Sequence, residues 1–506
     1  MQINVVKNAK RNMFFGAINR VVVLLIPFIK RVIVLNVLGS QYLGLGSLFQ
    51  SILSVLSLSE LGFSSAVVYN MYKPAAEGDV TKMNALLNFY RRAYRIIGVV
   101  ILGVGLCLIP FLPRLIKGTY PANINLTTFY LIYLVNTAIS YFLFAYKSSL
   151  LVVHQRDDVR SSINTILSVG LTGSQIAVLL NTKNYYLFSL LMPLFTIINN
   201  LLIAWRTKVL YPQYKAEGEL EAEDKAGIKK LVAGTFIHQA CYVTRNSLDS
   251  ICISAFLGLT LTAVYNNYYM ILTGVTGFVD IFTAAFTGGI GNHVATRSVE
   301  ENFQEMKKLD FVYLWIGGWC TICLLCLYQP FMEIWMGKNM MLPMSAVVLF
   351  CMYFYLLKLG KVRYLYTSAN GLWWEQRHRA LGETAMNLAL NVILGKVLGV
   401  HGIIIATMIS LFLCNYLWSV SITFRHYFGE DKIIEYYRYQ GFETVIMFVA
   451  AISTYLICSM ISTDNVFYNL ILRAAICVIV PNLLYFMVFR KTEQFQYARG
   501  LIFGRL

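Results

Sequence analysis

The sequence has little charge and little proline for its length. Asp, Glu, Lys and Arg make up 13% of its 506 residues, and only ten residues are proline. This charge content excludes an ordinary soluble domain, in which about a quarter of the residues are charged. Hydrophobic residues make up 58% of the chain, and the mean hydropathy is +0.61. We therefore expect an all-α integral membrane protein, because a helix satisfies its own backbone polar groups in lipid.

Long apolar stretches recur along the chain and are separated by short polar loops. Each is long enough to cross a hydrocarbon core of about 30 Å as a helix. We count fourteen predicted spans, at 13–38, 44–70, 94–112, 126–147, 161–181, 185–205, 231–257, 262–290, 311–334, 342–367, 380–398, 400–424, 442–461 and 466–489.

Lys and Arg are divided unequally between the two sets of loops. Loops on the side of the N-terminus hold 29 of the 42, and the opposite loops hold four: Arg114, Lys117, Lys183 and Lys338. The positive-inside rule then predicts that both termini are cytoplasmic. The net charge of +17 is scattered over many loops, so we expect anionic membrane lipids as partners and no nucleic acid.

Motifs for energy conversion, metal binding and glycan synthesis are missing from the sequence. It contains no P-loop, so energy must come from an ion gradient, substrate removal or a partner. Cys320, Cys323 and Cys326 lack a second cysteine cluster in the sequence, and we expect them to be packing residues with no metal. The predicted outer loops are shorter than about 15 residues, which disfavours a glycan polymerase or ligase. We therefore do not expect an enzyme.

The two halves of the chain share a pattern. Leu38-Gly39 and Leu257-Gly258 each end a predicted helix, and Glu60 and Asp280 follow 21 and 22 residues after those glycines. One helical face in each half also has matching spacing, formed by Arg20, Leu24, Pro27 and Arg31 in one and by His238, Tyr242, Arg245 and Asp249 in the other. Six predicted helices separate the two starts, so both copies have the same orientation.

This repeat predicts two pseudo-symmetric six-helix bundles around a central cavity. The predicted domains are an N-terminal bundle (1–205), a cytoplasmic linker (206–230), a C-terminal bundle (231–424) and an additional helix pair with a cytoplasmic tail (425–506). The additional pair lies outside the twelve duplicated helices, and a groove for a lipidic group is one interpretation of it. Its role stays open.

Cations inside the predicted spans outnumber the acids. The predicted pyrophosphate-binding residues are Arg20, Lys30, Arg31, Arg245, Lys358 and Lys361, against the acids Glu60, Asp249 and Asp280. Excess buried positive charge suits a ligand that supplies negative charge, such as a lipid-linked pyrophosphate. Three alternatives stay open. Arg245 and Asp249 could neutralise each other, only one of Lys30 and Arg31 need face the cavity, and Arg363, Lys396 and Arg473 are expected to extend to the interface.

Two further features bear on the transport cycle. Pro27 predicts a kink beside Arg31, because proline removes a helix hydrogen bond. Glu60, Asp249 and Asp280 are the candidates for coupling to H⁺ or Na⁺, and we expect no other cofactor. Glu60 and Asp280 have a second interpretation, as static ion-pair partners of the buried cations.

Several segments resemble a known family. "LGSQYLGLGSLFQSILSVLSLSELGFSSAVVYNMYKPAAEGDVTKMNALLNFYRRAYRIIG" (38–98) is similar to the start of bacterial polysaccharide flippases of the multidrug/oligosaccharidyl-lipid/polysaccharide exporter superfamily. "FLFAYKSSLLVVHQRDDVRSSI" and "FLGLTLTAVYNNYYMI" resemble its fourth-helix and seventh-to-eighth-helix regions. The resemblance implies a V-shaped fold of two bundles with twelve to fourteen helices. It also implies that Arg20, Arg31 and Arg245 match the cavity cations of such flippases.

The family resemblance implies a flippase of the O-antigen or capsule type in the bacterial inner membrane. It would move undecaprenyl-pyrophosphate oligosaccharides outward by alternating access, with ion coupling, for surface polysaccharide synthesis. We expect a monomer, with a polysaccharide polymerase and chain-length machinery as candidate partners. The nearest alternative is a cation-coupled drug antiporter of the same superfamily, which would favour twelve helices and an acidic cavity.

Overall fold

The computed structural model describes residues 5–60, 62–461, 463 and 465–503, and divides into two compact units. Unit 1 is Met1–Ala263 and unit 2 is Val264–Leu506. The secondary structure of the described residues is helical, and no strand occurs among them. The predicted all-α class is confirmed. The first residues of the predicted N-terminal loop and the last of the predicted tail lie outside the described residues.

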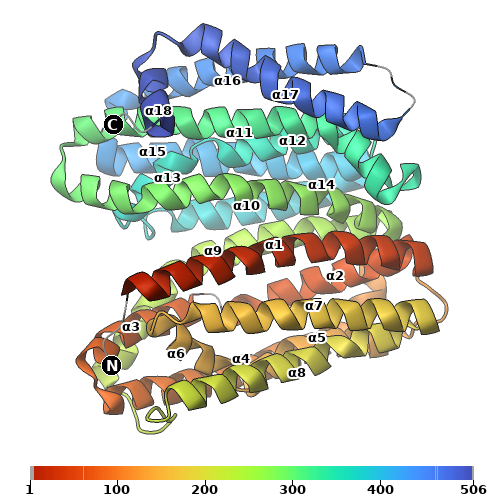
Figure 1. The fold of residues 1–506 in the computed structure, drawn as a ribbon, viewed down its shortest axis with the longest axis vertical. Coiled ribbons are helices and arrows are strands. Elements are labelled where there is room, and N and C mark those ends of the chain that lie inside the picture. The colour runs from red at the N-terminus through yellow and green to blue at the C-terminus, as the bar shows by residue number, and fades with distance from the viewer. Residues whose placement is uncertain (1–4, 61, 462, 464, 504–506) are drawn as a thin grey trace. The chain divides into compact units, whose positions relative to one another are not determined.

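Unit 1 is a bundle of long helices joined by short connections (Figure 1). α1 lies along α7, α2 packs on α9, and α5 packs on α8. Its helices are α1 (Val5–Leu38), α2 (Ser40–Leu56), α3 (Phe63–Glu77), α4 (Val80–Leu108), α5 (Leu126–Phe142), α6 (Ser148–Val153), α7 (Asp157–Thr182), α8 (Tyr185–Leu210) and α9 (Ala222–Leu257), with short 3-10 turns η1 (Ser57–Glu60), η2 (Ile109–Leu115) and η3 (Ala145–Lys147).

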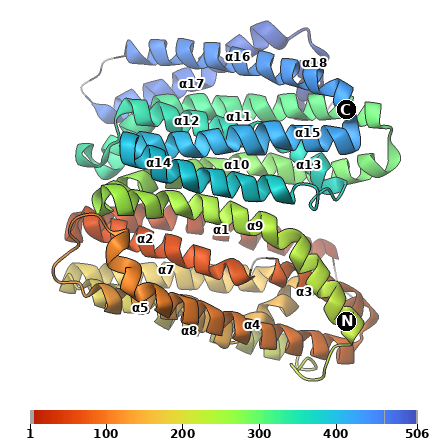
Figure 2. The same ribbon diagram turned by 180° about the vertical axis from the view of Figure 1, so that it is seen from behind.

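Unit 2 is organised around α11, which packs against α12, α16, α17 and α18 (Figure 2). Its elements are α10 (Leu259–Thr296), α11 (Val299–Met336), η4 (Lys338–Met340), α12 (Met344–Lys358), α13 (Lys361–Ala369), α14 (Arg377–Ser410), the π-helical η5 (Leu411–Trp418), α15 (Ser419–Thr423), η6 (Phe424–Phe428), η7 (Glu430–Lys432), α16 (Ile433–Ser459), α17 (Val466–Phe489) and α18 (Glu493–Phe503). The first turn of α10 belongs to unit 1.

Ten helices among the described residues are long and apolar enough to cross a membrane, or eleven if the bent pair α5–α6 is one span. One of the ten, Arg377–Phe428, is 52 residues long and reverses direction at Gly399, whose φ of 60° is not helical. Asn387 Nδ2 donates to Thr407 Oγ1 at 2.9 Å across this hairpin. Twenty residues of straight helix would separate those atoms by about 30 Å. The count of fourteen spans stays a prediction.

Both predicted Leu-Gly helix ends have the same geometry. α1 ends at Leu38 and α9 at Leu257, and Gly39 and Gly258 follow with φ of 101° and 95° and ψ of 175° and 173°. A residue with a side chain rarely adopts this φ, whereas glycine does so readily. Glycine at these two positions therefore lets the next helix start directly after the previous one ends. The matching turns support the repeat inferred from the sequence.

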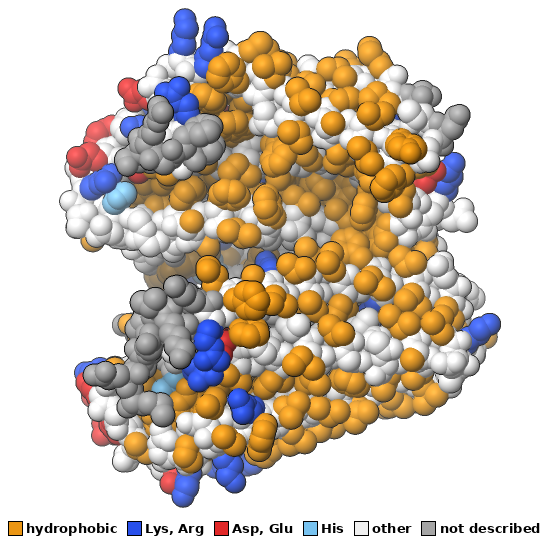
Figure 3. All heavy atoms as spheres, in the orientation of Figure 1, with side chains coloured by type: hydrophobic (Ala, Val, Ile, Leu, Met, Phe, Trp, Pro, Cys, Tyr) orange, Lys and Arg blue, Asp and Glu red, His pale blue; other side chains and the backbone are white. Residues whose placement is uncertain are grey.

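The faces of each unit are apolar, as a lipid contact requires. In Figure 3 hydrophobic side chains are spread over the visible surface of each unit, while Lys and Arg gather mainly at the left-hand end of its helices. Large exposed hydrophobic residues include Val397 at 76% and Ile166 at 68%. Anionic headgroups would meet such basic helix ends.

The connection between the two predicted bundles is shorter than the sequence predicted. α8 continues to Leu210 and α9 starts at Ala222, and the segment between them packs on α4. Arg92 donates to Glu219 Oε1 at 2.8 Å, which holds the pKa of Glu219 below its usual range. α9 is grouped with unit 1, whereas the sequence placed it in the C-terminal bundle; the predicted domain boundaries stay predictions.

Candidate functional site

Two predicted cations and one predicted acid meet inside unit 2. Lys358 Nζ lies 3.7 Å and Lys361 Nζ lies 3.9 Å from Asp280 Oδ1 of α10. Tyr313 of α11 donates to the same oxygen at 3.3 Å. The Lys358 side chain is 1% exposed, and those of Lys361 and Asp280 are 34% and 37% exposed. One carboxylate faces two ammonium groups, so the cluster has a net positive charge. The ion-pair interpretation of Asp280 matches this geometry.

The break between α12 and α13 brings the two lysines together. α12 ends at Lys358, and Gly360 has a φ of 71°, after which α13 starts at Lys361. Gly317 of α11 leaves room for Lys358, because a Cβ there would lie 3.2 Å from the Lys358 Cγ. Lys358 Nζ also lies 4.8 Å from the centre of the Phe354 ring, which favours a cation.

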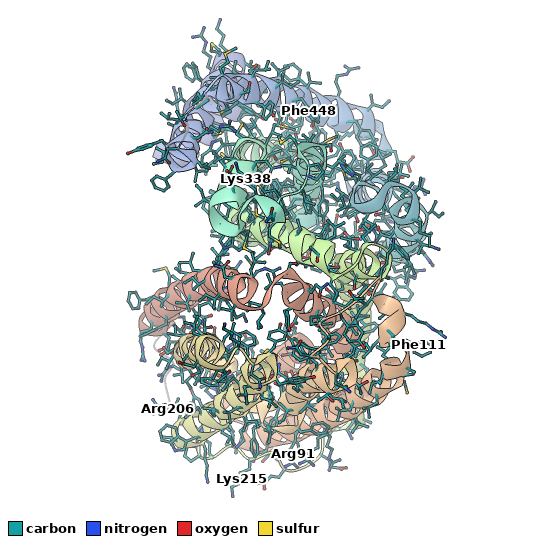
Figure 4. The ribbon with its side chains drawn as sticks, turned by 90° about the vertical axis from the view of Figure 1, so that its right-hand side faces the viewer. Arg91, Phe111, Arg206, Lys215, Lys338 and Phe448 are labelled. Atoms are coloured by element: carbon teal, nitrogen blue, oxygen red, sulfur yellow. The ribbon has the colours of Figure 1, made fainter. Side chains whose placement is uncertain are left out.

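An apolar groove of about 490 Å³ in unit 2 is lined by chain neighbours of Lys358, although neither lysine of the cluster nor Asp280 is part of its lining. Its walls come from α11, α12, η5 and α16, and Phe448, labelled in Figure 4, is one of its residues. Tyr355 and Leu359, on either side of Lys358 along the chain, line it, as does Thr321, one turn beyond Gly317. The charged cluster and the groove therefore share the same turns of α11 and α12. The last helix pair supplies one wall through α16.

Unit 1 contains the predicted cations of α1. Arg31 donates to Ala263 O at 3.2 Å and to Ser47 Oγ at 3.5 Å. Lys30 is half-buried and has no acidic partner within 4 Å among the residues that the structure describes, and Arg20 is exposed at the surface of α1. Pro27 lies inside α1, which continues as one helix from Val5 to Leu38.

The predicted pair on α9 is buried in unit 1. Arg245 is 5% exposed and Asp249, one helical turn later, is 2% exposed. The Arg245 guanidinium lies 5.4 Å from the centre of the Tyr242 ring. Two opposite charges one turn apart at this depth favour mutual neutralisation, which was one of the two interpretations of Arg245.

Glu60 lies in a tyrosine cluster of unit 1. Tyr94 and Tyr141 donate to its two carboxylate oxygens, and Tyr90 donates to Tyr94 at 2.8 Å. The described residues include no ion-pair partner for Glu60, so neither Arg20 nor Arg31 fills that role here. Hydroxyl donors stabilise a carboxylate without neutralising it. The part of Glu60 in ion coupling stays a prediction.

A basic pocket of about 230 Å³ opens elsewhere in unit 1. Arg91, Lys147, Lys208 and Lys215 line it together with tyrosines, and no acidic residue is among its lining. Figure 4 labels Arg91 and Lys215 in this part of the unit. The sequence had counted these residues only as loop cations.

Unit 2 also buries charged residues that the sequence did not single out or placed wrongly. Arg363 was expected to extend to the interface, and this is wrong, because it is 1% exposed. Its guanidinium donates to Ser419 Oγ at 2.8 Å and Thr423 Oγ1 at 2.9 Å, so hydroxyls from a neighbouring helix hold it inside. Lys396 is exposed and Arg473 is half-buried. Asp310 and Glu443 were overlooked, and both are buried.

Cysteines far apart in the sequence meet in the hydrophobic core of unit 2. The sulfur atoms of Cys326, Cys458 and Cys477 lie within 4.8 Å of one another among apolar side chains. This cluster was not predicted from the sequence, because more than a hundred residues separate Cys326 from Cys458. Small apolar packing is the simplest role for buried thiols, and the prediction of no metal remains untested.

Comparisons with known proteins identify the fold. No family model matches the chain, and no curated protein sequence matches it. Among solved structures, the inward closed conformation of the lipid II flippase MurJ matches with a TM-score of 0.66 and 14% identity, over 96% of this chain and 99% of that one.

Two transporters match as well. An inward-facing MATE family multidrug transporter of the MOP superfamily has a TM-score of 0.61 and 14% identity, over 79% of this chain and 94% of its own. The MATE transporter VcmN of Vibrio cholerae has a TM-score of 0.56 and 13% identity, over 84% and 98%. These structures are transporters and flippases rather than enzymes. The chain is therefore a multi-pass membrane protein with the helical fold of MurJ and the MATE transporters.

Proposed function

We propose that the protein is a flippase that moves undecaprenyl-pyrophosphate-linked oligosaccharides from the cytoplasmic to the outer leaflet by alternating access. The observation that carries this proposal is the net-positive cluster of Lys358, Lys361 and Asp280 beside the apolar groove of unit 2. An anionic headgroup joined to a long hydrocarbon chain needs both surfaces close together.

The cluster suits a pyrophosphate because its charges are not balanced. Two ammonium groups share one carboxylate, and the exposed third of Lys361 leaves its donors within reach of a ligand. The groove next to it has the apolar lining that a polyprenyl chain requires. In this proposal the sugars remain in water while the chain lies in the groove or the surrounding lipid.

The remaining predicted residues have supporting roles in this proposal. Lys30 and Arg31 of unit 1 add positive charge in this proposal, whereas Asp249 neutralises Arg245. Glu60 is the remaining candidate for coupling to H⁺ or Na⁺, since Asp280 faces two lysines. We further propose a monomer in the bacterial inner membrane with both termini cytoplasmic. A polysaccharide polymerase and its chain-length machinery would use the product, for surface glycans of the O-antigen or capsule type.

The MATE-like fold leaves a second candidate, a cation-coupled drug antiporter. An organic cation needs acidic or aromatic partners that are not already neutralised. Asp280 has two lysines within 4 Å, which disfavours a cation there. This charge balance is the reason for preferring the flippase.

Binding of defined lipids tests the proposal. Purified protein in nanodiscs is titrated with undecaprenyl pyrophosphate and, separately, with uncharged undecaprenol. We expect selective binding of the pyrophosphate, weakened about tenfold or more in Lys358→Gln/Lys361→Gln because two charge-assisted contacts are lost. Lys183→Gln, which removes an exposed lysine of unit 1, is the matched control and should bind as the wild type does. Equal binding of both lipids, or binding of an organic cation alone, would refute the flippase.

A further inference from the structure

Two carboxyl groups inside unit 2 have no role in the proposed function. Asp310 of α11 is fully buried, and Glu443 of α16 is 2% exposed. Gln440, one turn before Glu443, donates its Nε2–H to Asp310 Oδ2 and accepts from Tyr416 at 2.6 Å. The Asp310 and Glu443 carboxyl groups interact electrostatically across the contact between α11 and α16.

Most of the oxygen atoms of this pair lack hydrogen bonds. Asp310 Oδ1 and both Oε atoms of Glu443 have no hydrogen-bond partner among the described residues. Tyr439, on the same helix, lies close enough to interact with Glu443, but it donates its single hydroxyl proton to Lys307 O at 2.9 Å. An ionised carboxylate without donors is costly to bury, by several kcal/mol even after relaxation. A protonated carboxyl is neutral and can itself donate.

Around the pair, the buried carboxyl groups outnumber the buried guanidinium groups by one among the described residues. Arg363 interacts electrostatically with Asp310, and Arg379 forms a buried ion pair with Glu383 at 2.6 Å. Two guanidinium groups therefore face three carboxyl groups among the buried residues described here. One bound proton makes the region neutral.

The other elements packed around the pair bring no further cation among the described residues. The titratable and charged groups that face it are Tyr313 of α11, Tyr355 of α12, Arg363 of α13, Tyr416 of η5, Tyr436 and Tyr439 of α16, and Tyr485 of α17. All but Arg363 are phenols, which are uncharged at neutral pH. A proton is then the simplest way to balance the third carboxyl group.

We propose that Asp310 and Glu443 form a proton-binding site, in which the two carboxyl groups share one proton at neutral pH. The site is separate from Asp280 and goes beyond the proposed function, because it does not depend on the substrate. It lies directly behind the wall of the apolar groove, where Thr444, next to Glu443, bonds the Tyr355 hydroxyl at 3.1 Å. A proton on or off this pair would change the packing of the helix that forms that wall.

Dicyclohexylcarbodiimide tests the proposal, because this apolar reagent adds to protonated carboxyl groups. Purified protein is treated at pH 7 and pH 9, and the adducts are located by peptide mass spectrometry. We expect an adduct on Glu443 or Asp310 at pH 7 that decreases toward pH 9. Glu383 is the matched control, since it is also buried, at 6% exposure, but is paired with Arg379, and should stay unlabelled.

Single substitutions distinguish one proton shared by the two carboxyl groups from two carboxyl groups that bind protons independently. In Glu443→Gln, Asp310 faces Arg363 without a second carboxyl group and should ionise, so its labelling falls about tenfold or more. The carbonyl stretch of a protonated carboxyl in the infrared spectrum gives the same test without a reagent. An unlabelled pair at pH 7, protection by sodium, or undiminished labelling of Asp310 in Glu443→Gln would overturn the proposal.

Discussion

At the scale of single residues, the role of each buried charge follows from the groups that contact it and not from its depth in a predicted span. Lys358 and Lys361 share Asp280, Arg363 is held by hydroxyls, and Glu60 is held by tyrosines. A sequence shows which charges lie in apolar segments, but partners 34 to 81 residues away decide what those charges can do. Among the described residues, Lys358 and Lys361 combine excess positive charge with chain neighbours that line an apolar groove.

Gly44 gives a prediction at this scale. A Cβ at Gly44 of α2 would lie 2.0 Å from Leu259 O, so the start of α10 approaches α2 through the missing side chain. We expect Gly44→Ala to destabilise the protein by about 1–3 kcal/mol, because the backbone must move apart. Thermal unfolding followed by size-exclusion chromatography measures this change.

Gly103 supplies the control for Gly44. It lies within α4 of the same unit, and a Cβ there would meet nothing within 4 Å, so Gly103→Ala should be neutral or stabilising by up to about 1 kcal/mol. If the two variants unfold at the same temperature, the close approach of α2 and α10 is not what Gly44 provides.

At the scale of elements, the breaks between helices position the site. The sequence predicted one span over 342–367, whereas the structure has two helices there, α12 and α13, with Lys358 and Lys361 on either side of the break. A continuous, largely apolar stretch gives no signal for such a break. Gly360 was the only hint, and a single glycine inside a helical pattern is weak evidence.

Replacing Gly360 tests the importance of the break. Its φ of 71° disfavours any side chain, and a Cβ would lie 3.3 Å from Arg363 Nε. We expect Gly360→Ala to cost about 1–2 kcal/mol and to weaken binding of undecaprenyl pyrophosphate, because the two lysines lose their arrangement. Gly371→Ala has a similar φ of 67° and nothing within 4 Å, so it should lose stability without losing binding. Equal loss of binding in both variants would contradict the role of the break.

The packing of whole elements also explains why the burial of Asp310 and Glu443 could not be predicted from the sequence. Asp310 lies one residue outside the predicted span 311–334, and Glu443 is the second residue of the predicted span 442–461, so both read as interfacial. Burial follows because α11 lies in the middle of unit 2, surrounded by α12, α16, α17 and α18. Tertiary packing of this kind leaves no local signature.

At the scale of the whole molecule, hydrophobic periodicity and the Leu-Gly repeat were enough to predict an all-α membrane protein with a duplicated helix turn. Gly39 and Gly258 confirm that turn in detail. The meeting of Cys326 with Cys458 and Cys477, and of Lys358 with Asp280, could not be predicted, because such contacts join segments that only folding brings together.

The predicted orientation is open to a direct test on the whole molecule. An epitope inserted between Lys183 and Asn184, in an exposed connection with few cations, should be accessible from outside intact cells. An epitope inserted between Ala216 and Glu217, in the connection before α9, should become accessible only after the cells are opened. The reverse pattern would contradict cytoplasmic termini.

Translocation in proteoliposomes tests the central claim most directly. Vesicles containing a fluorescent undecaprenyl-pyrophosphate oligosaccharide are sampled for the fraction of sugar that a membrane-impermeant lectin can reach, with wild type, Lys358→Gln/Lys361→Gln or Lys183→Gln incorporated at equal levels. We predict that wild type and Lys183→Gln equilibrate the lipid between leaflets and that the double variant is slower by about tenfold or more. Equal rates for the double variant and wild type, or no exchange above empty vesicles with any of them, would contradict the account.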